Sequence, residues 1–165
     1  MEFFGSSTPF AEPLWYSRDV GSRYNESHRR VRNETRNYID REIAPFCAEW
    51  EAKGVIPDSV LKRHSGLGYT AALFNQADVG NHLGTQRLPG DVKQAEWDGL
   101  HHLICNDEVA RCGSLGVIWA LGCGTSIGVP PIINFGTPEQ QARFLPDAIK
   151  GNSRFCLGIT EPEGL

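Results

Sequence analysis

The chain has 165 residues, of which 40% are hydrophobic and 22% charged, and its formal charge at pH 7 is -4. A chain of this length can bury a core of its own, and this composition is typical of a globular domain. The negative charge argues against general affinity for nucleic acid or for anionic membranes. We therefore expect no nucleic-acid partner.

The five cysteines are odd in number and follow no spacing typical of a metal site or a disulfide framework. We expect reduced, buried thiols in an intracellular protein. Residues 1–24 contain Gly, Ser and Pro without periodicity, and no secretory or mitochondrial leader is evident in them. They are predicted to form an extended N-terminal arm, and the location is expected to be cytoplasmic or organellar, in a mitochondrion or a peroxisome.

A long amphipathic helix is predicted from Asn25, a suitable N-cap, to Gly54, a suitable end. The charged stretch HRRVRNETR, at residues 28–36, is interleaved with acidic residues and is predicted to be a solvated face. The apolar face repeats at helical spacing. It is formed by Val31, Tyr38, Ile39, Ile43, Phe46 and Trp50.

The middle of the chain predicts a short helix, a loop and a second long helix. The short helix is expected to begin at Pro57 and Asp58 and to be stopped by Gly66 and Gly68. Residues 70–90 are rich in turn formers and predict a surface loop. Apolar residues recurring over 91–112 predict the second long helix, with a kink near Gly99.

No charged residue lies between Arg111 and Glu139, a length that could cross a bilayer. Internal glycines and the pair Pro130-Pro131 fit poorly with an isolated membrane-spanning helix, and no basic clusters mark its ends. We expect a buried, glycine-rich pair of helices here and no membrane span.

Two motifs are incomplete as chemical sites. GCGTSIG, at 122–128, approximates a dinucleotide-binding fingerprint, but its third glycine is one residue late and prolines follow it. Close helix packing, or room beside a bound chain, explains these glycines better. His101 and Cys105 could share a helix face, but no second ligand pair accompanies them, so no metal is expected. Three further histidines, His28, His64 and His82, lie on surface-like stretches and are expected at the surface.

The stretch GTPEQQARFLPDAIKGN, at 136–152, carries the clearest local signal in the chain. Thr137 can cap a helix, Pro138 suits its first position, and Gln140 completes a capping box. Pro146 is predicted to break this helix and to begin a last turn.

RFCLGIT, at 154–160, is short and apolar, lies between turn formers, and predicts a β-strand. One strand cannot pair with itself, so a sheet is expected to follow. The predicted fold is therefore mainly α, with five or six helices and one orphan β-strand. The predicted domains are the arm 1–24, a helical domain over 25–152, and the start of a β-domain over 153–165.

The sequence PPIINFGTPEQQARFLPDAIKGNSRFCLGITEPEG, at 130–164, resembles the stretch of acyl-CoA dehydrogenases that joins the N-terminal helical domain to the middle β-domain. In that family a Pro-Ile-rich helix ends at a glycine, a GTPEQ-type helix follows, and a strand ends in Thr-Glu-Pro. REIAPFCAEWE at 41–51 and EVAR at 108–111 are compatible with the same family. The resemblance implies the N-terminal helical domain of an acyl-CoA dehydrogenase.

The resemblance also implies an FAD-dependent oxidoreductase that forms a double bond between the α and β carbons of an acyl-CoA thioester. In the family a carboxylate removes the α proton while a β hydride passes to the flavin. The pathway would be fatty-acid oxidation or the biosynthesis of a specialised metabolite. The full-length protein is expected to be a homo-oligomer.

Two sets of site residues follow from the resemblance. Backbone groups of Leu157, Gly158 and Ile159 are expected near the flavin, and the Thr160 hydroxyl is expected to hydrogen-bond its ring. The glycine-rich segment corresponds to helices that line the acyl pocket, with core packing as an equal alternative. Its candidate lining residues are Trp119, Ala120, Cys123 and Ile127.

No carboxylate of this chain matches the catalytic base, which is expected in a C-terminal domain beyond these residues. The resemblance therefore predicts a truncated form without catalytic residues, with weak or absent FAD binding and no dehydrogenase activity of its own. The alternative is a non-catalytic helical interaction module, or a decayed gene product derived from the same fold.

Overall fold

The structure is a computed structural model that describes residues 8–9, 11–13, 23–74 and 86–164. Six helical runs containing α-helix occur among these residues, in agreement with the predicted mainly α fold. They span 26–53, 58–66, 69–72, 99–110, 115–135 and 138–150. Most of the predicted arm 1–24 and part of the predicted loop 70–90 lie outside the described residues.

The first run is the predicted long helix, built from α2 (Glu26–Tyr38), η1 (Ile39–Ile43), η2 (Ala44–Phe46) and α3 (Cys47–Lys53). The Asn25 side chain accepts hydrogen bonds from the backbone N–H groups of Ser27 and His28, which confirms the predicted N-cap. Gly54 ends the run with a φ of 68°, a left-handed conformation that glycine adopts without steric cost. Phe46 is 44% exposed rather than buried. The π-helical turn η1 and the 3-10 turn η2, which ends at Phe46, change the number of residues per turn and so rotate its side chain away from the predicted apolar face.

Two short helices follow, α4 (Asp58–Gly66) and α5 (Tyr69–Ala72). The prediction of this helix is confirmed, since α4 begins at Asp58, directly after Pro57, and ends at Gly66. The prediction of a loop from residue 70 is wrong at its start, since α5 occupies these positions and all four of its residues are buried. Helix α5 packs against α4 and α10, and this packing stabilises its helical conformation. Because α10 is distant from α5 in the sequence, the residues of α5 alone do not predict a helix.

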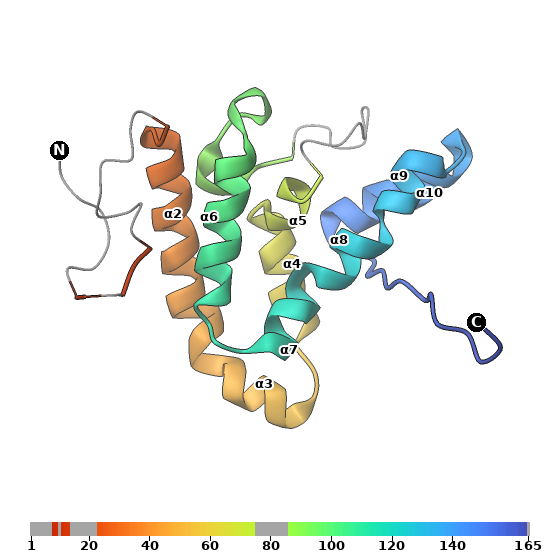
Figure 1. Cartoon of the computed structure of the whole chain (residues 1–165), viewed down its shortest axis with the longest axis horizontal. Coiled ribbons are helices and arrows are strands. Elements are labelled where there is room, and N and C mark those ends of the chain that lie inside the picture. Colours follow the sequence, from red (N-terminus) through yellow and green to blue (C-terminus); the bar gives the residue numbers. More distant parts are fainter. Residues whose placement is uncertain (1–7, 10, 14–22, 75–85, 165) are drawn as a thin grey trace.

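Two 3-10 turns, η4 (Pro89–Asp91) and η5 (Gln94–Glu96), precede α6 (Gly99–Ala110). The predicted helix start at residue 91 is therefore wrong. The Asp98 side chain accepts hydrogen bonds from the backbone N–H groups of Leu100 and His101, so Gly99 is the first helical residue rather than a kink. Helices α2 and α6 lie side by side with their N-termini at the same end of the molecule (Figure 1).

The charge-free segment forms one helical run, built from α7 (Leu115–Ile118), η6 (Trp119–Cys123), α8 (Gly124–Gly128) and α9 (Pro130–Phe135). The prediction of a buried helix pair is wrong on both points. Val129 keeps helical backbone angles, with φ -86° and ψ -35°, so the chain does not reverse before the prolines. Among the described helices, this run is long and apolar enough to cross a bilayer by length and composition, and 22% of its apolar window is buried.

Helix α10 (Pro138–Lys150) begins at the predicted capping box of Thr137 and Gln140. The predicted break at Pro146 is wrong, because α10 continues through it to Gly151. Proline removes one helical hydrogen bond, but side chains on either side of it anchor the helix against α4 and α5. The anchoring residues Leu145, Ala148 and Ile149 are each 1% exposed.

Residues 154–160 do not form the predicted β-strand. After α10 the chain continues as an irregular segment, whose far end points away from the helices (Figure 1). A strand needs a neighbouring strand to complete its hydrogen bonds, and the described residues include none.

The cysteines depart in part from the predicted burial. All five thiols are free, as expected, but burial holds only for Cys47 and Cys105. Cys112 and Cys123 are half-buried, and Cys156 is exposed because it lies on the irregular segment after α10.

Candidate functional site

The chain that follows α10 lies against the glycines of α8. A Cβ at Gly124 would lie 2.3 Å from the carbonyl oxygen of Phe155, and a Cβ at Gly128 would lie 3.0 Å from the Cβ of Phe155. The backbone of Cys156 would lie 3.3 Å from that same added atom. These glycines therefore make room beside another chain segment, the role that their sequence favours over dinucleotide binding.

The predicted flavin-contacting residues continue directly from this contact. Leu157 is 44% exposed and Ile159 is 75% exposed, and Gly158 and Thr160 are exposed as well. Within the described part of the chain, no backbone hydrogen bond joins residues 157–160 to another segment. The segment therefore presents free backbone donors and acceptors beside a hydroxyl group, while its contact with flavin stays a prediction.

A cavity of about 310 Å³ lies between α5, α6 and the stretch from η6 to α8. We call it the α6 cavity. A volume of this size reaches the lower end of the range for small-molecule pockets. Its wall includes His64, Leu73, His102, Asn106, Leu121 and Cys123.

The four predicted acyl-pocket residues are not brought together. Cys123 lies in the wall of the α6 cavity, whereas Ala120 lines a separate cavity of about 130 Å³ beside Trp50. Trp119 is 61% exposed and Ile127 is 53% exposed. Their contact with a substrate therefore stays a prediction.

The helical run from α7 to α9 and the segment after α10 expose several large apolar side chains. Such a concentration is typical of a surface that another part of a protein covers. The exposed residues are Leu115, Trp119, Ile127, Phe135, Leu157 and Ile159.

The N-termini of α2 and α6 share a polar cluster that the sequence analysis missed. The backbone N–H of Asn25 donates to Nδ1 of His28 at 3.0 Å, and that of Asp98 donates to Nδ1 of His101 at 3.1 Å. The two imidazole rings stack with their centroids 3.9 Å apart. His28 is 1% exposed and His64 is 6% exposed, so their predicted surface positions are wrong, and His82 lies outside the described residues. The available signal was a capping residue followed by His three positions later, which occurs twice.

Ligand-type atoms of His28, Asp98 and His101 lie within 4.8 Å of one another. The Nε2 of His28 lies 3.1 Å from Oδ1 of Asp98, and Nε2 of His101 lies 2.9 Å from the Ser27 hydroxyl. Burial lowers the pKa of His101, and the neighbouring His28 lowers it further. The hydrogen bonds of this cluster are those of the N-terminal caps of α2 and α6, which lie next to each other. Cys105 takes no part in it, since its Sγ lies 4.0 Å from the Thr35 hydroxyl.

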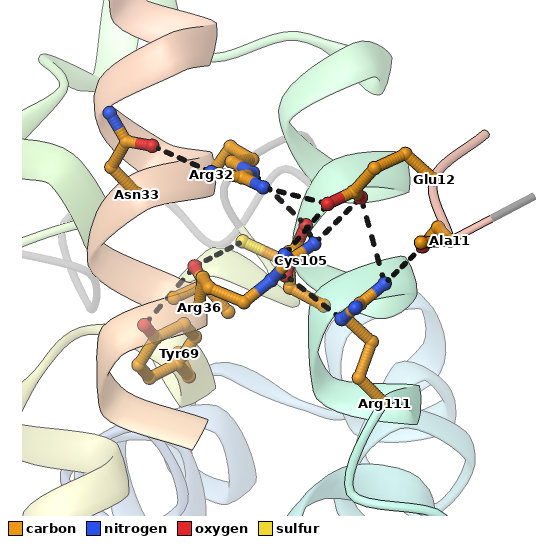
Figure 2. Close-up of polar contacts among 10 residues, drawn as sticks. Ala11, Glu12, Arg32, Asn33, Arg36, Tyr69, Cys105 and Arg111 are labelled. Atoms are coloured by element: carbon orange, nitrogen blue, oxygen red, sulfur yellow. Dashed lines mark hydrogen bonds and ion pairs between the residues drawn. The ribbon is translucent and has the colours of Figure 1, made fainter. Parts of the chain in front are cut away.

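A buried charge network joins α2 and α6 to the segment at residues 11–12 (Figure 2). Arg36 donates to both carboxylate oxygens of Glu12 at 2.9 Å and to Glu108 at 2.8 Å. Burial opposes the charge of Arg36, but the hydrogen bonds to Glu12 and Glu108 outweigh it and raise the pKa. The prediction of a solvated face is therefore wrong for Arg32 and Arg36, whose carboxylate partners come from distant segments.

A family model described as acyl-CoA dehydrogenase, N-terminal domain, matches residues 25–152. The acyl-CoA dehydrogenase AFT10-1 of Alternaria alternata is 65% identical over 161 residues, which cover 98% of this chain and 37% of that protein. The acyl-CoA dehydrogenase apdG of Emericella nidulans is 39% identical over 162 residues, covering 96% of this chain and 36% of that protein. The mitochondrial short-chain specific acyl-CoA dehydrogenase of Rattus norvegicus is 25% identical over 138 residues, covering 83% and 30%. The chain thus spans 30–37% of the length of these relatives.

Proposed function

The chain belongs to the acyl-CoA dehydrogenase family, and from this premise we propose that it forms the N-terminal helical part of an FAD-dependent enzyme. The proposed reaction introduces an α,β double bond into an acyl-CoA thioester. The supporting observation is the position of α8, which carries Ser126 in the wall of the α6 cavity and Gly124 beneath Phe155. The predicted flavin-contacting segment therefore begins beside a cavity that can receive part of an acyl chain.

The residues at 157–160 are compatible with a flavin. Their backbone groups make no backbone hydrogen bond to another segment that the structure describes, and the exposed Leu157 and Ile159 could pack on an aromatic ring. The Thr160 hydroxyl can both donate and accept a hydrogen bond, which suits a ring whose charge changes during turnover. Bound FAD would supply the hydride acceptor, and these residues would orient it.

We propose that the catalytic base comes from residues other than the 165 of this sequence. No carboxylate of the chain matches the family's base, and the matched relatives are almost three times as long. We expect the 165-residue chain alone to bind FAD weakly or not at all, and the whole enzyme to be a homo-oligomer. The acyl-CoA would belong to fatty-acid oxidation or to the biosynthesis of a specialised metabolite.

A chimera tests this proposal, with residues 1–164 of this chain followed by the part of AFT10-1 that lies beyond the matched region. The identity of 65% makes the two parts suitable for exchange. We expect the chimera to carry FAD, measured by flavin absorbance, with AFT10-1 itself as the positive control. A folded chimera without FAD, beside a flavin-containing AFT10-1, would contradict the proposal.

The alternative is a non-catalytic interaction module of the same fold, and the exposed apolar side chains of α7 to α9 favour it. Such a module would use this face to bind another protein and would need no flavin. Flavin content separates the two functions, because a chimera whose FAD is reduced by an acyl-CoA supports the enzymatic function, whereas a folded chimera without FAD favours the interaction module.

A further inference from the structure

The α6 cavity has a polar wall on one side. His102 and Asn106 are four residues apart on α6, so they lie on the same face of the helix, and both line the cavity. His102 is half-buried and Asn106 is exposed, and in the part of the chain that the structure describes neither the His102 ring nitrogens nor the Asn106 amide has a hydrogen-bond partner. This wall therefore offers unused donors and acceptors to a molecule in the cavity.

Helix α4 contributes a second imidazole to the same cavity. His64 is 6% exposed, and its Nδ1 lies 3.2 Å from the Tyr38 hydroxyl. The other ring nitrogen of His64 has no partner among the described residues. Burial lowers the pKa of His64 to about 3 and also lowers that of His102, so both rings are neutral at pH 7. A neutral imidazole carries one donor and one acceptor nitrogen.

The rest of the wall is largely apolar, with Leu73, Val109, Ile118 and Leu121 among its residues. A volume of about 310 Å³ holds about ten water-sized groups at roughly 30 Å³ each. A plain hydrocarbon chain of that size would cover the polar wall without hydrogen-bonding to it. Covering the free nitrogen of the buried His64 without a hydrogen bond weakens binding, and the chain would also displace water from His102 and Asn106. A chain with a matching polar group would satisfy these groups.

We propose that the α6 cavity receives an acyl chain that carries a neutral oxygen substituent, such as a hydroxyl group, hydrogen-bonded by His102, Asn106 and His64. This inference deepens the proposed function, on which it rests for the identification of the bound molecule as an acyl chain. Neutral side chains surround the cavity's polar wall, so an uncharged hydroxyl fits it better than a carboxylate, whose buried charge would have no partner.

The binding of two matched probes to the 165-residue chain tests the proposal. Octanamide presents a plain chain and 8-hydroxyoctanamide presents the same chain with a terminal hydroxyl. Isothermal titration of each should give a dissociation constant about ten-fold lower for the hydroxylated probe, the effect of one well-made hydrogen bond to a buried group such as His64. The double variant His102→Leu, Asn106→Leu should lose or reverse this preference.

Two further variants separate the proposed role from a structural one. His102→Gln keeps a hydrogen-bonding group and should retain a preference for the hydroxylated probe. Leu103→Ala, at a 49% exposed position of α6 outside the cavity wall, should leave both dissociation constants unchanged. Circular dichroism confirms that each variant remains helical.

The proposal is overturned if the wild-type chain binds octanamide as tightly as the hydroxylated probe, or binds neither. It is also overturned if the folded double variant keeps the full preference. The probes require neither flavin nor coenzyme A, so this outcome is independent of the flavin content of the chimera. A chimera without FAD would remove the proposed function and leave the measured probe preference intact.

Discussion

The carbonyl oxygen of Phe155 occupies the place where a side chain at Gly124 would begin, since a Cβ there would come within 2.3 Å of it. The contact holds the chain after α10 against α8 at the point from which the predicted flavin-contacting segment leaves. Gly122 lies two residues earlier in the same helical run, and a Cβ there would meet Leu73 at an ordinary 3.7 Å. The two glycines form a matched pair for mutation.

Gly124→Ala should displace the backbone at Phe155 and lower the free energy of unfolding by about 1–3 kcal/mol, as overpacking does. Gly122→Ala should leave stability unchanged or raise it slightly, because alanine is the better helix former. Urea unfolding gives the free energies, and mass spectrometry of tryptic fragments follows cleavage after Arg154. Equal cleavage rates at Arg154 in both variants would show that Gly124 does not seat the chain.

Gly68→Ala should destabilise the fold by about 2–4 kcal/mol, combining backbone strain with a steric clash. Gly68 has a φ of +94°, and a Cβ there would lie 2.1 Å from the carbonyl oxygen of Arg87. Gly66→Ala is the control, since nothing lies within 4 Å of its added Cβ among the described residues. Thermal unfolding should separate the variants clearly, and similar melting temperatures would refute the close approach at Gly68.

Glu108→Ala should cost about 3–5 kcal/mol, because it breaks a buried ion pair and leaves the half-buried Arg36 charge with half of its carboxylate partners. The Glu108 side chain is 0% exposed and lies between Arg36 and Arg111 in the network. Glu49→Ala removes an exposed partner of Lys53 and should cost at most about 0.5 kcal/mol. Urea unfolding compares the two, and a loss below about 1 kcal/mol for Glu108→Ala would mean that the network contributes little.

Stability should fall on acidification because His64 is held neutral in the fold, with a pKa of about 3. The unfolded chain binds a proton near the ordinary histidine pKa of about 6.5, so this contribution is complete above that pH. Below it, the fold loses up to about 1.4 kcal/mol per pH unit until the pH approaches the folded-state pKa. Burial also lowers the pKa of His101, which acts in the same direction.

Unfolding free energies at pH 7, 6, 5 and 4 measure this dependence. His64→Gln keeps a polar group beside Tyr38 but does not titrate, so its pH profile should be shallower than that of the wild type. Carboxylates contribute equally to both profiles, and the difference isolates His64. Parallel profiles would show that His64 is not held neutral.

Local signals predicted the helices well. Asn25, Gly54 and the capping box of Thr137 mark helix ends by chemistry confined to one turn, and the structure confirms all three. Membership of the acyl-CoA dehydrogenase family could also be predicted from the sequence, because the family's motif occupies one continuous stretch, near residues 130–164.

Features that depend on distant partners could not be predicted. Pro146 remains helical because α4 and α5 hold α10 on both sides of it. Arg36 is half-buried and paired because Glu12 and Glu108 come from other segments, and His28 is buried because it stacks on His101. The α6 cavity likewise combines residues of four helical segments, so neither its position nor its polar wall has a local signature.

The most direct measurement is the flavin absorbance of the chimera before and after addition of an acyl-CoA. We predict a flavin-containing protein whose absorbance bleaches on substrate addition, with Thr160→Val weakening FAD retention and Thr160→Ser restoring it through the hydroxyl. A folded chimera that carries no FAD, or whose flavin no acyl-CoA reduces while AFT10-1 responds under the same conditions, would contradict the account.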